Sequence, residues 1–122
     1  MARLRLSHAA ETDIIDILAW SQSRFGETAR RRYEHLIVVA LSDVASDPFR
    51  PGSLARSELG EGVRSWHLRA SRLRVAAPGT VVARPRHLII YRQTGPDLVA
   101  VGRLLHDAME LRRHLQARDI WE

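Results

Sequence analysis

An apolar run near the C-terminus, residues 98–105, ends in a cluster of ionisable side chains and constrains the fold more than any other stretch. The run is rich in valine, leucine and alanine, which is typical of a buried strand. Arg103, His106 and Asp107 lie at its end, and a short helical pattern over residues 108–115 follows. Ionisable groups at the end of a buried strand are costly unless they are paired or exposed for a function. We therefore interpret the rest of the chain as a scaffold for this strand.

The N-terminal third predicts a strand and two amphipathic helices. Residues 3–6 alternate arginine and leucine, which is the period of a strand with two different faces. Ser7 is suited to cap the following helix, whose apolar stripe runs to Phe25, and Gly26 ends it. A second apolar stripe predicts a helix over residues 27–45. Because the turn between them is short, we expect the two helices to form an antiparallel hairpin.

The rest of the chain alternates turn signals with strand patterns. Proline and glycine punctuate residues 47–60, which predicts a loop, and residues 63–70 alternate as a strand. Residues 71–85 are irregular and basic, residues 87–93 form the next strand, and a turn follows at residues 94–97. The predicted fold is α+β: an N-terminal strand, an antiparallel helix hairpin, a three-stranded antiparallel meander and a short C-terminal helix. The hairpin is expected to pack on one face of an antiparallel sheet.

Length and composition indicate a single domain spanning residues 1–122, since a chain of 122 residues can bury one hydrophobic core. The chain has no cysteine, which excludes disulfides and thiolate metal sites. It has no apolar run of the roughly 20 residues that a membrane span needs, and its first residues lack the apolar core of a signal peptide. We expect a cytoplasmic protein that does not associate with membranes.

The charge of the chain points to an acidic partner. Arginine and lysine together number 19, all of them arginine, and the formal net charge is +5. Codon bias in a GC-rich genome is one explanation, but the physical consequence is the same. Positive charge favours nucleic acid or an acidic protein as the partner. Arginine binds carboxylates and phosphates through paired donors, and it is too basic to accept a proton at neutral pH.

Short motifs spread along most of the chain carry a family resemblance. They are the opening LRLSHAAETDI with Ser7, Ala10 and Asp13, then Trp20, Phe25-Gly26, Gly62-Val63-Arg64-Ser65, RHLIIYR at residues 86–92 and VGRLLHDAME at residues 101–110. In this order they resemble the RelE/ParE superfamily of type II toxins, and the ParE branch most. Two features depart from the family pattern: the segment 71–85 is longer than a minimal hairpin, and the lysines of many RelE-type nucleases are absent.

The resemblance implies a toxin that a cognate, ParD-like antitoxin neutralises in a hetero-oligomer. ParE-like members are associated with inhibition of DNA gyrase, whereas RelE-like members are ribosome-dependent mRNA endonucleases that share the fold. We expect a ParE-like gyrase inhibitor and keep the endonuclease as the alternative. A third possibility is an inactive or regulatory module that works only with its antitoxin.

If the chain is a nuclease, the candidate catalytic residues are His106, Arg103, Arg64 and Tyr91. Cleavage of RNA through the 2′-hydroxyl needs a general base, a general acid and cations near the phosphate. His106 is the candidate acid or base, and Arg64 is a candidate phosphate ligand. Tyr91 is suited to donate a proton or to stack on a base, and His67 is a second titrating group.

Each candidate also has a structural interpretation. His106 at a corner would hydrogen-bond the backbone, and Asp107 would cap the terminal helix. Arg103 would form an ion pair with a helix acid, and Tyr91 and Trp66 would pack in the core. The sequence has no histidine and carboxylate spacing typical of a metal site and no glycine-rich phosphate loop. We therefore expect neither a metal nor a cofactor.

The expected partner makes a physical demand on the surface. A basic protein with an apolar groove should bind an acidic amphipathic segment that folds on it. We expect this groove between the helix hairpin and the sheet, and a bare, arginine-rich sheet face that a macromolecule covers. The predicted partner-binding residues are Arg64, Arg69, Arg72, Arg74, Arg86 and Arg103.

Overall fold

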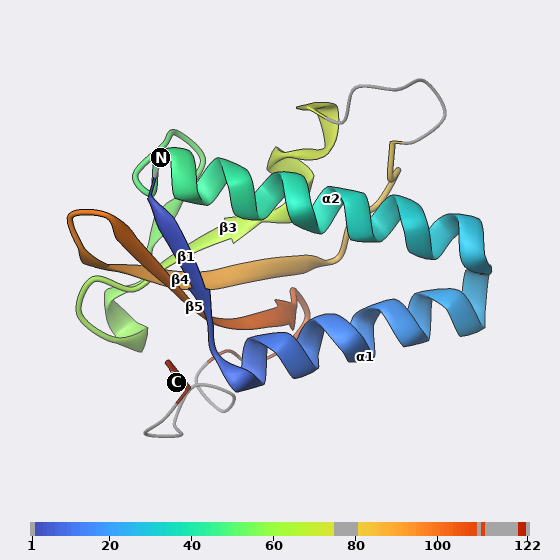
Figure 1. Ribbon diagram of the computed structural model, residues 1–122, viewed down its shortest axis with the longest axis horizontal. Coiled ribbons are helices and arrows are strands. Elements are labelled where there is room, and N and C mark those ends of the chain that lie inside the picture. The colour runs from blue at the N-terminus through green and yellow to red at the C-terminus, as the bar shows by residue number, and fades with distance from the viewer. Residues whose placement is uncertain (1, 75–80, 110, 112–119, 122) are drawn as a thin grey trace.

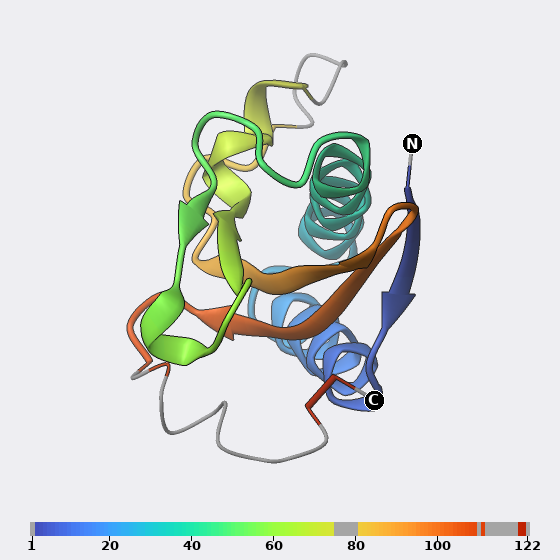
Figure 2. The ribbon, with the colours of Figure 1, turned by 90° about the vertical axis from the view of Figure 1, so that its left-hand side faces the viewer.

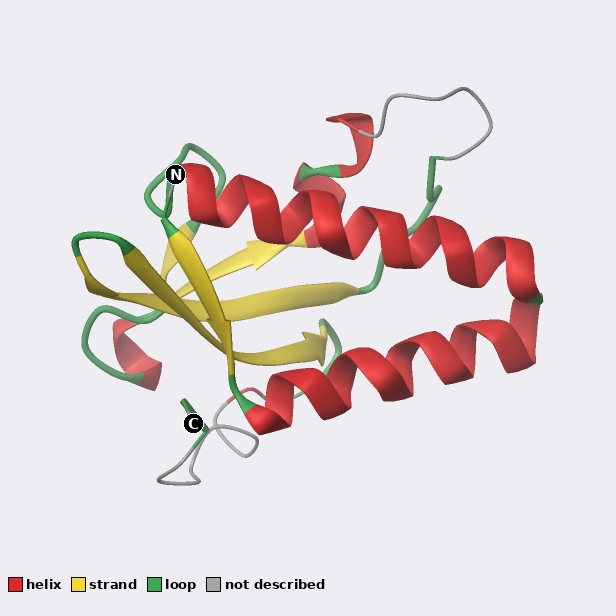
Figure 3. Ribbon diagram, viewed as in Figure 1, coloured by secondary structure: helices red, strands yellow, loops and turns green. Residues whose placement is uncertain are grey.

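The computed structural model describes residues 2–74, 81–109, 111 and 120–121. Two long helices lie over one face of a twisted sheet (Figures 1 and 3). In chain order the elements are β1 (Arg3–Leu6), α1 (His8–Phe25), α2 (Glu27–Ser46), β2 (Leu54–Ala55), β3 (Arg64–His67), β4 (His87–Gly95) and β5 (Leu98–His106). This arrangement confirms the predicted α+β class.

The N-terminal strand and the helix hairpin follow the predicted pattern. Ser7 caps α1, because its Oγ accepts the backbone N–H of Ala10 at 2.9 Å. The same hydroxyl donates to the carbonyl of Gly102 at 2.6 Å, so the cap also fastens the helix to β5. Gly26 separates the helices with a φ of 93°, a conformation that residues with a side chain disfavour.

The sheet is mixed, which corrects the expectation of a purely antiparallel one. Its order in the described chain is β1-β5-β4-β3-β2, so β1 and β2 lie at opposite edges (Figure 2). β1 runs parallel to β5, from Arg3 opposite Leu98 to Leu6 opposite Val101. The other neighbours are antiparallel. Parallel strands need a long crossover connection between them. The helix hairpin, which crosses one face of the sheet, is part of the connection between β1 and β5.

The larger hydrophobic core fills the layer between the helices and the sheet. Trp66 and Tyr91 belong to it, which confirms their packing interpretation. The buried Tyr91 hydroxyl donates to the carbonyl of Pro48 at 2.6 Å, and the Trp66 indole N–H donates to Ser71 Oγ at 2.8 Å. The other buried members are Ala10, Ile17, Leu36, Ile37, Ala40, Val44, Leu68, Ile89, Val99, Val101 and Leu104.

The opposite face of the sheet is partly covered by the chain itself. A second buried cluster consists of Val63, Leu88, Ile90 and Leu105, with Leu59, Leu111 and Trp121 packed on it. Trp121 lies against Gly102, where an added Cβ would come within 3.0 Å of the ring. The Arg92 guanidinium stacks over Trp121 at 4.5 Å from the ring centroid. The expectation of a bare sheet face was therefore wrong for this part, because the chain supplies its own apolar cover.

Three element boundaries differ from the predicted ones. The segment expected as a loop contains β2 and a 3₁₀ helix at Ser57–Leu59. The strand expected over residues 63–70 ends at His67, because His67 Nδ1 accepts the Arg69 backbone N–H at 3.1 Å and the chain turns into a 3₁₀ helix. β4 continues to Gly95, which shortens the turn before β5.

Two predicted segments fall partly outside the described residues. Most of the expected C-terminal helix, residues 108–115, lies there, as do residues 75–80 of the irregular segment. The described beginning of the irregular segment contains a 3₁₀ helix at Arg72–Arg74. Within the described ranges, no helix has the length and apolar character that a membrane crossing requires.

Candidate functional site

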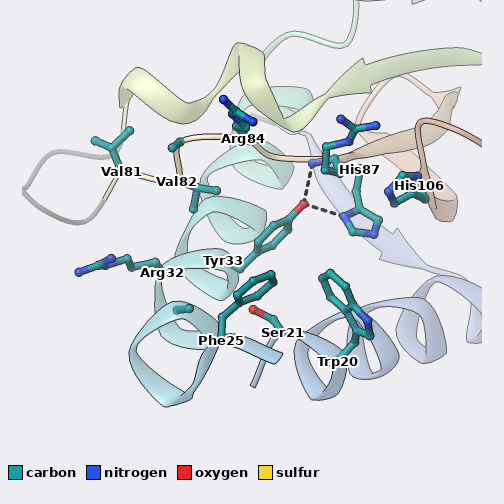
Figure 4. A pocket seen from close by; sticks show the side chains of 13 residues that line it. Trp20, Ser21, Phe25, Arg32, Tyr33, Val81, Val82, Arg84, His87 and His106 are labelled. Atoms are coloured by element: carbon teal, nitrogen blue, oxygen red, sulfur yellow. Dashed lines mark hydrogen bonds between the residues drawn. The ribbon is translucent and has the colours of Figure 1, made fainter. Parts of the chain in front are cut away.

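An open pocket lies at the turn end of the helix hairpin, where β4 begins and β5 ends (Figure 4). Its volume is about 340 Å³. The lining residues are Trp20, Ser21, Phe25, Ala29, Arg32, Tyr33, Val81, Val82, Ala83, Arg84, Arg86, His87 and His106. Three of these described residues are arginines and none is acidic, so the pocket suits an anionic or acidic group.

Two exposed aromatic side chains form one wall of the pocket. Trp20 is 52% exposed and Phe25 is 63% exposed, although both sit on the helix that carries the core stripe. Their rings meet edge to face at a centroid distance of 5.5 Å. Large exposed aromatic groups beside a pocket are typical of recognition surfaces. The wall therefore offers apolar area to a bound chain.

A hydrogen-bonded pair, Tyr33 and His87, forms the floor of the pocket. The Tyr33 hydroxyl accepts the Arg86 backbone N–H at 3.1 Å, so its own proton points to His87 Nδ1 at 2.6 Å. Burial raises the pKa of Tyr33 to about 12. Burial, followed by the charge of His106, lowers the pKa of His87 to about 4. His87 is therefore neutral at pH 7 and carries its proton on Nε2.

His106 lies opposite His87 in the strand register and is more accessible. The two rings meet edge to face at a centroid distance of 5.4 Å. His106 Nδ1 accepts the Ala108 backbone N–H at 3.1 Å, which confirms its predicted backbone contact. Because Nδ1 accepts this hydrogen bond, the ring carries a proton on Nε2, and this N–H group remains available to a ligand.

Asp107 joins two basic side chains from different strands beside the pocket. Its Oδ2 accepts from His67 Nε2 at 2.9 Å, and its Oδ1 lies 3.1 Å from Arg86 Nη2. Burial alone would raise the pKa of Asp107, but the hydrogen bond from His67 and the charge of Arg86 lower it below its ordinary value. The carboxylate thus stays charged and holds Arg86 at the rim.

Arg103 is paired with a helix acid, as its structural interpretation predicted. Its Nε and Nη2 donate to the two carboxylate oxygens of Asp13 at 2.7 and 2.9 Å. Asp13 also accepts the Leu104 backbone N–H at 3.0 Å. The hydrogen bond from Arg103 to Asp13 raises the pKa of Arg103. This bidentate pair fastens α1 to β5.

Arg64 and Tyr91 lie away from His106. Arg64 and Tyr91 are opposite each other in the pairing of β3 with β4. Tyr91 is four residues after His87 in β4, and four residues of a strand span about 13 Å. Arg64 donates to Ser53 Oγ at 2.7 Å and stacks over Phe49. The four sequence candidates for a nuclease site are therefore not gathered at one place, and only His106 lines the pocket.

The remaining predicted partner-binding arginines have different surroundings. Arg72 donates to the carbonyl of Ala83 at 2.8 Å, and Arg74 forms an ion pair of 2.8 Å with the buried Asp43. Arg69 is exposed. Among the six predicted arginines, Arg86 is the one that lines the pocket.

Sequence reasoning missed most of the pocket floor. The spacing of Tyr33 places it in the apolar stripe of α2, so nothing in the sequence indicated a role for its hydroxyl group. His87 opens a strand and looked like an ordinary core or surface histidine. The sequence did contain a signal for the pocket wall in Trp20 and Phe25. Two large aromatic residues close together near the end of one helix can indicate a recognition surface.

The N-terminal strand, the helix hairpin and the antiparallel strands that follow are consistent with the fold of the RelE/ParE superfamily of toxins. The family model for the ParE toxin of type II toxin-antitoxin system, parDE, matches residues 4–111. This match covers most of the chain, and the protein belongs to the ParE toxin family. The resemblance seen in the sequence motifs is thereby confirmed. No curated protein matches the sequence.

Proposed function

We propose that this protein inhibits DNA gyrase by protein–protein contact and that an acidic, ParD-like antitoxin holds it inactive in a cytoplasmic hetero-oligomer. In this proposal residues 1–122 act as one toxin domain. Membership of the ParE family supports an antitoxin partner. The observation that carries the proposal is the basic pocket with its exposed aromatic wall. Such a pocket is suited to an acidic segment that folds on binding, rather than to a small neutral substrate.

An acidic amphipathic segment matches the chemistry of each part of the pocket. Its apolar side chains would cover Trp20 and Phe25, which are more than half exposed. Its carboxylates would pair with Arg32 and Arg84 at the rim. The Nε2–H group of His106 offers a further donor to a carboxylate.

Two exposed apolar residues of α1 give a matched test of antitoxin binding. Trp20→Ala should weaken antitoxin binding about 30-fold, because a large aromatic anchor in an interface is typically worth about 2 kcal/mol or more. Ile15→Ala is the control, since Ile15 is 67% exposed on the same helix and does not line the pocket. Isothermal titration with the purified antitoxin measures both. Equal affinities for the two variants would contradict docking in the pocket.

The target is tested with the purified toxin in a gyrase supercoiling reaction and in a ribosome-programmed translation reaction. Loss of supercoiling, or accumulation of cleaved DNA, is the expected result. Cuts at codon positions in the mRNA with supercoiling intact would reject the gyrase proposal in favour of an endonuclease. If neither reaction responds, the protein is an inactive or regulatory module.

One observation favours the endonuclease as the second candidate. The accessible His106 lies beside Asp107 and the rim arginine Arg86, which is an arrangement suited to proton transfer next to a bound phosphate. In that function His106 acts as the general acid or base and Arg86 binds the phosphate. His106→Ala should then abolish mRNA cleavage while the fold persists. Unchanged cleavage would remove His106 from the mechanism.

A further inference from the structure

Two arginines at the rim of the pocket have no acidic partner among the described residues. Arg32 lies on α2 and Arg84 in the segment before β4, and both residues are exposed. The third arginine of the pocket, Arg86, is already paired with Asp107 at 3.1 Å. Arg32 and Arg84 therefore give the rim two positive charges that no described carboxylate neutralises.

The interior of the pocket is aromatic and apolar. Trp20 and Phe25 line it from the α1 side, and Val82 lies across from them (Figure 4). The Tyr33 hydroxyl is occupied by two hydrogen bonds, so the pocket meets mainly the carbon atoms of this ring. Flat aromatic surfaces of this kind are suited to pack against an aromatic ring of a ligand.

The ionisable side chains of the pocket offer hydrogen-bond donors to a ligand. The guanidinium groups of Arg32 and Arg84 carry donors only, and His106 presents its Nε2–H group. A matching ligand must bring acceptors and negative charge. A phosphate monoester has several acceptor oxygens and a charge of about −1.5 to −2 at pH 7, which matches two unneutralised arginines better than a single carboxylate does.

The volume of the pocket limits such a ligand to one small molecule. It is about 340 Å³, near the lower end of the range of about 300–1,000 Å³ that is usual for small-molecule sites. The apolar interior suits one heterocyclic base, whereas a phosphate group would remain at the open rim, where water and the arginines solvate it.

A neighbouring hollow determines the orientation of the ligand. This hollow shares Trp20 with the pocket and also contains Asp16, which is exposed. The carboxylate of Asp16 repels a phosphate group, since the two carry charge of the same sign. The phosphate is therefore directed to Arg32 and Arg84, and the base to the side of Trp20.

We propose that the pocket binds a nucleoside 5′-monophosphate. The base packs against Phe25 and Trp20, and the phosphate pairs with Arg32 and Arg84 at the rim. The antitoxin segment proposed above would use the same arginines, so this site belongs to the protein without its antitoxin. The test needs neither antitoxin nor gyrase and therefore decides this proposal separately from those assignments.

Nuclear magnetic resonance titration of the isotope-labelled full-length protein tests the proposal with three probes. These are adenosine 5′-monophosphate, adenosine, which lacks the phosphate, and ribose 5-phosphate, which lacks the base. The monophosphate should bind at least about tenfold more tightly than either of the other two. Its binding should shift the indole N–H signal of Trp20 and leave that of Trp121, on the far face of the sheet, unchanged.

A pair of variants with the same change in net charge tests the rim. Arg32→Ala/Arg84→Ala should lower the affinity for the monophosphate at least about tenfold and leave the affinity for adenosine unchanged. The matched control is Arg31→Ala/Arg69→Ala, which removes two exposed arginines that do not line the pocket. The control should bind all three probes as the natural protein does.

A variant of the interior tests the place of the base. Phe25→Ala should weaken the monophosphate and adenosine to the same extent, and it leaves the core intact because Phe25 is 63% exposed. Equal binding of the monophosphate and ribose 5-phosphate would indicate charge attraction alone and overturn the proposal. Equal losses in the two double variants, an unmoved Trp20 signal, or no binding of the monophosphate at millimolar concentration would overturn it as well.

Discussion

Acidification should destabilise this protein through His87, the buried acceptor of the Tyr33 hydroxyl at 2.6 Å. Burial, and next the charge of His106, lower the pKa of His87 from its ordinary 6.5 to about 4. The unfolded chain therefore binds this proton more tightly than the folded one. The contribution of the neutral His87 ring to the free energy of unfolding is fully present above the pKa that His87 has in the unfolded chain. This contribution is lost as the pH falls toward 4. This pKa difference between the folded and the unfolded chain corresponds to about 3 kcal/mol in the free energy of unfolding. About 2 kcal/mol of it is lost between about pH 7 and about pH 5.

Urea unfolding at a series of pH values measures this loss. The matched variant is His87→Gln, which keeps a hydrogen-bond acceptor for Tyr33 and removes the titrating ring. Asp107 does not obscure the result, because its pKa lies below its ordinary value and it stays charged in this range. The free energy of unfolding should fall less with acid in His87→Gln than in the natural protein. If the two curves run parallel from about pH 7 to about pH 5, His87 is not the group that titrates.

Two further predictions concern contacts that join distant parts of the chain. Asp13→Ala should lower the free energy of unfolding, measured with urea, by about 2–4 kcal/mol, because it removes the carboxylate that pairs with the mostly buried Arg103 guanidinium. A decrease below about 0.5 kcal/mol would contradict this. Gly102→Ala should displace Trp121, since the new Cβ would lie 3.0 Å from the ring, and tryptophan fluorescence should report the shift. Gly95→Ala, where nothing lies within 4 Å of the added Cβ, is its control, and identical spectra for the two variants would refute the packing argument.

The helix hairpin could be predicted because its signals are local. The apolar stripes repeat every three to four residues, Ser7 caps the helix that follows it, and Gly26 permits the turn. Each of these features depends on residues that are close in sequence. The order of strand, helix, helix and strands, together with the motifs, was sufficient to indicate the ParE family.

The sheet was predicted less well because its pairing is long-range. The parallel contact of β1 with β5 joins Arg3 to Leu98, and no local period encodes which edge a short strand will join. The cover of the far face by Trp121 depends in the same way on where the chain end folds back. The two-residue strand β2 is too short for alternation to reveal it.

The sequence by itself determined the number of arginines, the amphipathic helices and the family of this protein. Only the tertiary structure decided which arginines are committed to internal partners. Arg103 pairs with Asp13 and Arg74 with Asp43, whereas Arg32 and Arg84 reach the pocket. The physical reason is that charge and periodicity are properties of residues and their near neighbours. An ion pair or a pocket exists only after packing has brought distant side chains within a few ångströms of one another.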